Sequence, residues 1–319
     1  MARLIRKTAI LAKLEATYGQ AAVPNGATDA MLISDASIDY QYKNVSRALL
    51  RPYLGGSEEL VGTRTVQMSF TVELAGSGTA GTAPAWGTLL RASAMAETVV
   101  VGTCVEYTPV SGGMESCTMD YSLDGVRYRA VGCRGTASLG LGEGERPTLK
   151  FTFTGLDAGA VTAADPSVNF AAWQIPHVVT NANSAGVLLG CTYLDGAFTG
   201  GTAYPSRGLS AELGQGVQHI PLLGRESVEI TERDTKGSLQ LDLTAAQVVD
   251  FMTAINANVP TSLGFTHGTQ AGHQVLVFAP SVQRINPKVD DFNGTALLGM
   301  DLRLLPTTLG NDEIRIIAA

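Results

Sequence analysis

The chain has 319 residues, 45% of them hydrophobic and only 16% charged, which is typical of globular domains and excludes a disordered tail. The net charge is −7, and basic residues cluster only at Arg3, Arg6 and Lys7, so the composition argues against a protein that grips nucleic acid through its phosphates. Abundant glycine, with 36 residues, and few aromatic residues favour short strands joined by tight turns.

The amino-terminal segment MARLIRK is basic, but the apolar run at residues 8–12 ends at Lys13. That run is too short for the apolar part of a secretory signal, which needs about 7–15 residues. No stretch of about 18 apolar residues that could span a membrane follows. We therefore expect a protein that is made and kept in the cytoplasm.

A long polar stretch, Asn44–Arg64, comes before the clearest strand of the chain. In that strand, Thr65–Leu74 (TVQMSFTVEL), apolar and polar residues alternate, as in a strand with one buried and one wet face. Loops of this length are uncommon inside compact domains and are often functional, so we expect Asn44–Arg64 to contact another subunit; the alternative is a solvated loop.

A glycine-rich loop, residues 75–83, follows the strand and contains the pattern GxGxxG. A dinucleotide site needs a buried parallel strand before this pattern and a helix directly after it. Here the strand alternates, and the expected helix Ala85–Met95 starts only after Pro84, with Trp86, Leu89 and Leu90 on one face. We therefore interpret the pattern as a loop and expect no cofactor.

Further strands are predicted at Val105–Thr108, Ser116–Leu123, Val126–Gly132 and Thr148–Thr154, with Asp124-Gly125 as a hairpin turn. The stretch 157–205 is rich in Gly, Ala, Asn and Thr. We interpret it as a linker with short strands around Trp173–Thr180 and Val187–Tyr193.

The same plan returns in the second half of the chain. A polar stretch, Gly214–Lys236, precedes an alternating strand, Gly237–Leu243, and a helix, Ala245–Asn256, which the capping box Thr244/Gln247 introduces. Short strands at residues 262–266 and 274–279 and an alternating strand at Leu298–Leu304 complete it. The sequence thus predicts a mainly β protein of two tandem sandwich or barrel units, each with one helix and a long loop. The predicted domains are 1–156, with an arm at 1–19, a linker at 157–205, and 206–319.

Residues that could carry chemistry are scattered. Four cysteines without CxxC spacing, Cys104, Cys117, Cys133 and Cys191, are expected to be buried thiols. His267 and His273 have hairpin spacing but no acidic or thiol partner in a ligand pattern. No nucleophile motif is present, so we expect no metal, no cofactor and no enzyme.

Several runs taken together resemble the major tail tube protein of long, non-contractile-tailed bacteriophages. They are RKTAILAKLEATYG (6–19), RPYLGGSEELVGTRTVQMSFTVELAGSGTAGTAPAWGTLLRA (51–92), YTPVSGGMESCTMDYSLDGVRYRAVGCRGT (107–136) and PTLKFTFTGL (147–156). The resemblance implies rings whose sheets surround a channel, stacked through a long loop and terminal arms. Single-unit members form rings of six, so a double unit implies trimers with pseudo-sixfold symmetry.

The resemblance also implies roles for particular residues. The polar strand faces would line the channel, and three acids against two bases would make it weakly acidic, so that DNA slides without binding; these residues are Gln67, Ser69, Thr71, Glu73, Lys150, Thr152, Gln240, Asp242, Asp301 and Arg303. The two polar stretches would bridge adjacent rings through Arg47, Arg51, Glu58, Glu59, Arg225, Glu226, Glu229 and Arg233. The arm would dock on a neighbouring subunit.

The implied partners are further copies of the chain, a tape measure protein in the lumen, the tail terminator, distal tail or baseplate proteins, and DNA in passage. The implied location is the virion tail, assembled in the host cytoplasm, with no membrane contact. An alternative from another class is a surface β-sandwich that binds carbohydrate or mediates adhesion. Such sites usually cluster exposed aromatic residues, and only Trp86 and Trp173 are tryptophans here.

Overall fold

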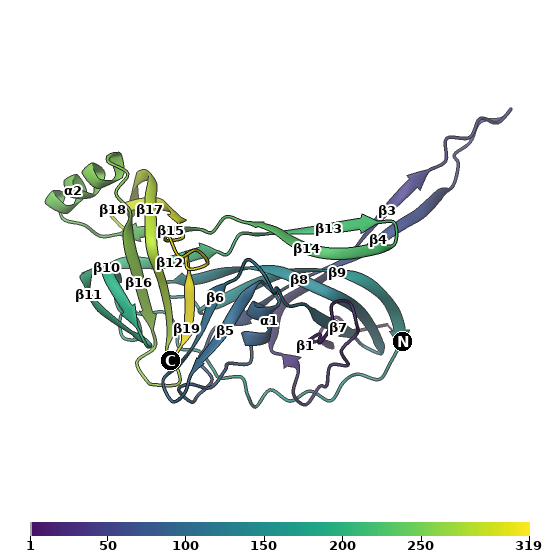
Figure 1. Ribbon diagram of the computed structural model, residues 1–319, viewed down its shortest axis with the longest axis horizontal. Helices are drawn as coiled ribbons and strands as arrows, with labels where there is room; N and C mark the ends of the chain where they lie inside the picture. The colour runs from purple at the N-terminus through teal and green to yellow at the C-terminus, as the bar shows by residue number, and fades with distance from the viewer. Residues whose placement is uncertain (1) are drawn as a thin grey trace.

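The computed structural model describes residues 2–319, which form nineteen strands and two helices (Figure 1). The first half contains β1 (Thr8–Leu14), β2 (Ala30–Met31), β3 (Ile33–Ser46), β4 (Glu59–Glu73), α1 (Gly87–Arg91), β5 (Met95–Val100), β6 (Cys104–Pro109), β7 (Cys117–Leu123), β8 (Val126–Gly142) and β9 (Thr148–Thr162). The second half contains β10 (Val187–Leu194), β11 (Ala197–Tyr204), β12 (Ser206–Glu212), β13 (Gln215–Leu222), β14 (Arg225–Arg233), β15 (Lys236–Leu241), α2 (Ala245–Asn256), β16 (Thr261–His267), β17 (Val275–Phe292), β18 (Thr295–Leu304) and β19 (Arg315–Ala318). The predicted mainly β class is confirmed.

One order of strand pairing occurs twice along the chain. In the first half it is β1–β7–β8–β9–β4–β3, and in the second half it is β10–β16–β17–β18–β15–β12, with every pair antiparallel. The irregularities agree as well. Strand β3 has a bulge at Asp35, whose φ is 53°, and β12 has a bulge at Gly208, whose φ is 105°. These matches make Ile33 equivalent to Ser206 and Val72 equivalent to Leu241. The pairing order supports the duplication that the sequence pattern predicts.

The two repeats share one sheet. The second half of β8 pairs with β12, from Ser138 opposite Glu212 to Gly142 opposite Gly208, which we call the internal junction. The resulting eight-stranded inner sheet has the order β3–β4–β9–β8–β12–β15–β18–β17. Apart from the separate hairpin β13–β14, the remaining strands form an outer layer. In it, β1, β2 and β7 belong to the first repeat and β10, β11, β16 and β19 to the second, and β6 and β5 from the first half of the chain continue the sheet beyond β19. The sheet closes no barrel within the described chain, since both its end strands have an unpaired edge.

The core lies between the inner and outer layers, as the alternation of β4 predicts. Val66, Met68 and Phe70 are buried, and the rings of Phe151 and Phe153 on β9 lie 6.1 Å and 6.0 Å from that of Phe70. Burying such aromatic and aliphatic side chains stabilises the fold by roughly 1.5–3 kcal/mol each. One stripe of side chains therefore accounts for much of the stability of the first repeat.

The two predicted helices differ in outcome. Helix α2 has the predicted bounds, and Thr244 and Gln247 form the reciprocal capping box. Helix α1 covers only Gly87–Arg91 within the predicted Ala85–Met95, although Trp86, Leu89 and Leu90 are buried as expected. The chain leaves the helix because Ala94 adopts a left-handed φ of 57° and Met95 already pairs with Pro109 in β5–β6.

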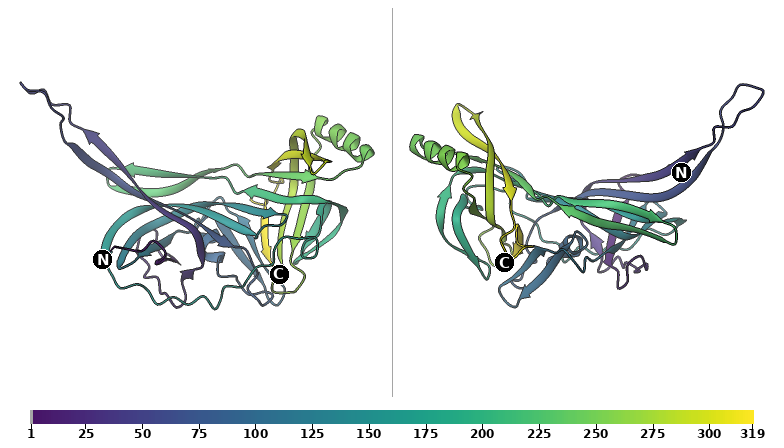
Figure 2. Two further views of the ribbon diagram at one scale, coloured as in Figure 1. Left: turned by 180° about the vertical axis from the view of Figure 1, so that it is seen from behind. Right: turned by 45° about the horizontal axis from the view of Figure 1, so that its top comes forward.

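The two polar stretches are hairpins and not loops, which corrects the prediction. Residues 44–46 and 59–64 extend the β3–β4 hairpin, while 215–222 and 225–233 form the separate sheet β13–β14. Both faces of β3 near its tip are exposed, so the apolar alternation that marks a half-buried strand is absent there. Figures 1 and 2 show β3–β4 projecting from the body and β13–β14 lying across β8 and β9.

Two further expectations need correction. Residues 173–180 form no strand; Trp173 instead donates from its ring nitrogen to Ala30 O, 3.0 Å away. Within the arm, Thr8–Leu14 is strand β1, paired with β7 of the same chain rather than with a neighbour. The domain boundaries stay a prediction, although β10 inside the proposed linker pairs with β16 of the second repeat.

Candidate assembly surfaces

One face of the inner sheet is polar across both repeats. The predicted channel residues on β4 and β9 share it, since Ser69 and Thr152 lie opposite each other with their hydroxyls 3.2 Å apart. On the second repeat, Gln240, Asp301 and Arg303 point away from the buried residues of β15 and β18. Asp242 follows β15 and is exposed. The structure thus brings nine of the ten predicted residues onto inner-sheet strands and leaves Asp242 at the end of one.

Charges on this face are partly balanced within the chain. Arg146 donates to the Glu73 carboxylate at 2.6 Å, and Asn286 donates to Asp301 at 2.9 Å. Lys288 lies 3.3 Å from Asp290, whose other oxygen accepts from Gln240. The face is therefore a mixed, hydrated surface without a concentrated charge of either sign.

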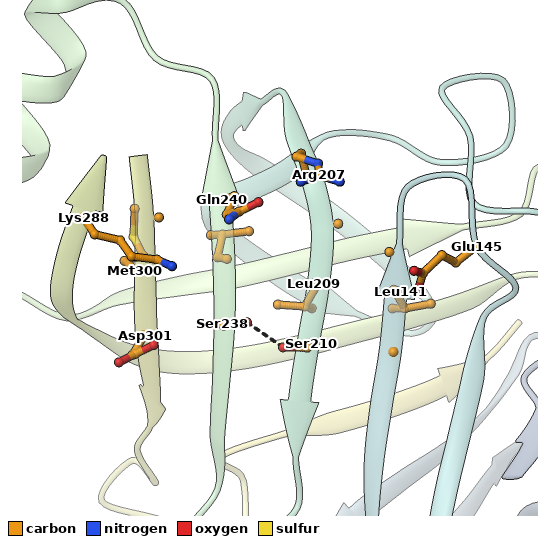
Figure 3. Close-up of a pocket in the computed structure, with 15 residues that line it drawn as sticks. Leu141, Glu145, Arg207, Leu209, Ser210, Ser238, Gln240, Lys288, Met300 and Asp301 are labelled. Carbon is orange, nitrogen blue, oxygen red and sulfur yellow. Dashed lines mark hydrogen bonds between the residues drawn. The ribbon is translucent and has the colours of Figure 1, made fainter. Parts of the chain in front are cut away.

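The internal junction crosses this polar face without forming a deep pocket. Figure 3 shows Ser210 and Ser238 hydrogen-bonded at 2.7 Å, with Lys288 and Asp301 on neighbouring strands. The hollow of about 410 Å³ here exists because four of its lining residues are glycines without side chains: Gly140, Gly142, Gly208 and Gly299. Its mixed lining lacks the apolar walls that small-molecule sites usually have.

Both ends of the inner sheet are open. Among residues 2–319, strand β3 pairs only with β4, and β17 beyond Gln283 pairs only with β18. An unpaired strand edge presents free backbone N–H and C=O groups that another chain can pair with. The sheet therefore carries two complementary sites for extension.

Near its tip, the projecting β3–β4 hairpin holds several of its charges in contacts within the chain. Arg47 pairs with Glu58, Arg51 lies 3.5 Å from the same carboxylate, and Asn44 donates to Glu59 at 3.2 Å. Its apolar side chains are free instead, with Val45, Leu49, Leu50, Tyr53, Leu54, Leu60 and Val61 all exposed. Exposed apolar clusters of this kind are typical of interaction surfaces.

The β13–β14 hairpin is fastened to the first repeat by buried polar contacts. Arg134 pairs with Glu229 and donates to Val228 O at 2.9 Å, while its guanidinium lies 4.8 Å from the ring of Tyr18. Gln215 donates to Ser93 O at 2.7 Å and accepts from Thr136. Two predicted ring-bridging residues, Glu229 and Arg233, are thus held within the chain, since Arg233 pairs with the buried Glu313.

The tip of this hairpin is again apolar. Leu222 and Leu223 are exposed, whereas Glu226 contacts His219 at 2.8 Å and Arg225 contacts Glu229 at 2.9 Å. Sequence reasoning chose the charged residues of both stretches and missed the Leu-Leu pairs. Leu222 and Leu223 stand between Pro221 and Gly224, and Leu49 and Leu50 come shortly before Pro52, so an apolar pair beside turn-forming residues is the signal that could have found them.

The remaining candidates for chemistry are structural. The loop with the GxGxxG pattern packs against residues 268–273, with Gly78 N donating to Gly272 O at 2.8 Å. His267 is buried, with one ring nitrogen 2.8 Å from the Ser184 hydroxyl and the other 3.1 Å from His177 O. Within residues 2–319, no three His, Cys, Asp or Glu side chains gather as a metal site. No helix in this range is both long and apolar enough to cross a membrane.

Comparison with known proteins points to one family. No curated protein matches the chain. The family model described as phage tail tube protein matches residues 5–304, nearly the whole chain and both repeats. The chain therefore belongs to the phage tail tube protein family, whose members are structural components of the virion tail.

Proposed function

We propose that three copies of this chain close into a ring and that the rings stack into the tail tube. The observation that carries this proposal is the internal junction, which joins two repeats edge to edge in one curved sheet and leaves a free strand edge at each end. Copies that add edge to edge continue the inner sheet, and closing the ring pairs both of its free edges, as in a barrel. Two repeats per chain give six repeats in a ring of three.

The polar face of the inner sheet would then line the channel. A wall of hydroxyls, amides and balanced charges offers DNA no row of basic side chains to bind, so the genome passes without being held. Before the genome enters, the same wall would surround a tape measure protein. The opposite face of the inner sheet is covered by the core and the outer layer, which leaves this face as the one available to a lumen.

The two hairpins would connect successive rings. Leu50 and Leu223 are fully exposed at their tips, and burial of these side chains in a partner would be favourable. The terminal rings of the tube would use the same surfaces to meet the tail terminator at one end and the distal tail proteins at the other.

Negative-stain electron microscopy of the purified chain, together with its mass by light scattering, tests this proposal. We expect tubes, or rings with the mass of three chains and six-fold features in projection. A monodisperse monomer at all concentrations and ionic strengths would contradict it.

A further inference from the structure

The internal junction provides a template for the contact between chains. It joins the bulged edge strand of the second repeat, β12, to the second half of β8 in the first. The equivalent strands in the other repeat are β3 and the second half of β17, and these are the two strands with an open edge. The contact made once inside the chain is thus available a second time between chains.

Equivalent positions follow from the shared pairing. On the edge strands, Ile33 corresponds to Ser206, so Ile38 corresponds to Ala211 and Asp39 to Glu212. On the next strands of the two repeats, Lys150 is equivalent to Gly299. Ser138 lies opposite Lys150 and Lys288 lies opposite Gly299, so Ser138 is equivalent to Lys288. One residue further along, Leu139 is therefore equivalent to Val289. These equivalences convert the internal register into one for two chains.

We infer that β3 of one chain pairs antiparallel with β17 of the next, with Ile38 opposite Val289 and Asp39 opposite Lys288. This seam rests on the proposed function, because it is the contact that closes the ring. The bulge residue Asp35 carries a Cβ where Gly208 meets Leu141 O at the internal junction, so the pairing begins beyond Asp35 and covers residues 37–40.

Burial supports this register. At the internal junction, Leu139 and Ala211 are 3% and 2% exposed, whereas the equivalent Val289 is 74% exposed and Ile38 is half-buried. The apolar pair that is buried at the internal junction thus corresponds to an exposed Val289 and a half-buried Ile38 at the open edges. The seam would bury both of them.

Charge supports it as well. Asp39 is exposed and makes no ion pair within residues 2–319, and the Lys288 ammonium is largely exposed beside Asp290. At the internal junction, Leu213 N donates to Ala137 O, so Leu213 and Ala137 are a hydrogen-bonded pair. Hydrogen-bonded and non-hydrogen-bonded pairs alternate along an antiparallel ladder, so the next pair, Glu212 and Ser138, is a non-hydrogen-bonded pair, whose side chains lie closer together and which we call a close pair. Asp39 and Lys288 would occupy the corresponding close pair, with opposite charges facing each other.

A disulfide between chains tests the register directly. Ser37 and Asp290 would form the next close pair, so we expect Ser37→Cys with Asp290→Cys in one chain to cross-link assembled rings into a closed trimer. The trimer should be the largest main product on a non-reducing denaturing gel and should revert on reduction. In the control, Gln41→Cys with Asp290→Cys, the cysteines are offset by four residues, or about 13 Å, which a disulfide cannot bridge.

Charge exchange provides a second test. Asp39→Lys and Lys288→Asp should each lower the yield of rings at least about tenfold, and the double variant should restore it. Glu212→Lys, the same change at the internal junction, should leave the yield unchanged, because that contact lies within one chain. Circular dichroism confirms that each variant is folded.

The outcomes separate the seam from the proposed function. Wild-type tubes combined with no more cross-linking of Ser37→Cys/Asp290→Cys than of the control would overturn the seam and leave the tube standing. A cross-linked ladder that continues beyond three chains would overturn closure at three. A wild-type chain that forms neither rings nor tubes would overturn the proposed function itself.

Discussion

Leu50 and Leu223 are both fully exposed at hairpin tips, and they lie seventeen residues after Ile33 and Ser206, which are equivalent residues of the two repeats. The bodies of the hairpins differ, because one projects freely and the other is fastened over β8 and β9. That both tips nevertheless end in Leu-Leu indicates a shared role in contacting another molecule. We interpret that molecule as a copy in the adjacent ring.

Replacing both leucines tests this role. We expect Leu50→Asp with Leu223→Asp to yield rings of normal mass that fail to stack, because each aspartate removes buried apolar surface worth about 2 kcal/mol and adds a charge that burial would desolvate. Tube length in electron micrographs is the measurement. Ile175→Asp, a change at another exposed apolar residue away from both hairpins, is the matched control. Tubes of normal length from the double variant would show that the tips do not hold the rings together.

Arg134 determines how the β13–β14 hairpin is held. Arg134→Ala leaves Val228 O without its donor and Glu229 without its buried partner, a loss of about 3 kcal/mol in local stability. Hydrogen exchange should accelerate in residues 215–233 while β4 and β9 keep their protection. Arg225→Ala removes an exposed ion pair to the same Glu229 and a 3.3 Å hydrogen bond to the Ser227 hydroxyl, and it should change exchange little. Equal acceleration in the two variants would rule out Arg134 as the fastening residue.

The parts of the fold that local patterns predict are those with one buried face. Strands β4, β9 and β18 and helix α2 were predictable because each alternates or repeats with the period of its element, and α2 also has a capping box. The distal part of β3–β4 has solvent on both faces, so no period marks it. The internal junction between β8 and β12 depends on residues about 70 positions apart, and no local feature of either strand reveals that pairing.

The candidate surfaces divide in the same way. The polar face was predictable because strand geometry fixes the direction of every second side chain. The charged residues assigned to ring contacts were chosen for their polarity, and the structure shows most of them in pairs within the chain, which leaves the leucines free. Which charges form ion pairs within the chain depends on the fold, so these pairs cannot be predicted from the sequence alone.

His267 makes stability depend on pH. Burial lowers the pKa of His267 below its ordinary value of about 6.5, and the hydrogen bond to His177 O only partly opposes that effect. The unfolded chain therefore takes up a proton at a pH where the folded chain does not, so the stability that His267 contributes is complete above about pH 6.5 and falls as the pH drops below it.

The expected loss is at most about 1.4 kcal/mol per pH unit until the folded pKa is reached. Thermal unfolding of the subunit between pH 7.5 and 5.5 measures it, and His267→Gln should flatten this part of the profile. Ser184→Ala removes the hydroxyl on the ring but keeps the titrating group, so it should lower the melting temperature while retaining the slope. An unchanged slope in His267→Gln would assign the pH dependence to other groups.

The channel wall can be tested by making it bind DNA. Thr152 and Gln240 lie on the polar faces of β9 and β15, one in each repeat, so Thr152→Lys with Gln240→Lys adds positive charge evenly around the proposed ring. Both side chains are half-buried on the polar face, and the long lysine side chain can extend its ammonium into water, so rings and tubes should still form. Tubes of this variant should retain short duplex DNA in co-sedimentation, and the logarithm of the binding constant should fall with the logarithm of salt concentration by about 0.9 per phosphate neutralised.

Wild-type tubes should retain little, and so should tubes of Thr98→Lys, which places lysine on the outer strand β5. Phages that carry the double variant should eject their genomes more slowly. If the double variant retained no more DNA than Thr98→Lys, the polar face would have to lie outside the lumen.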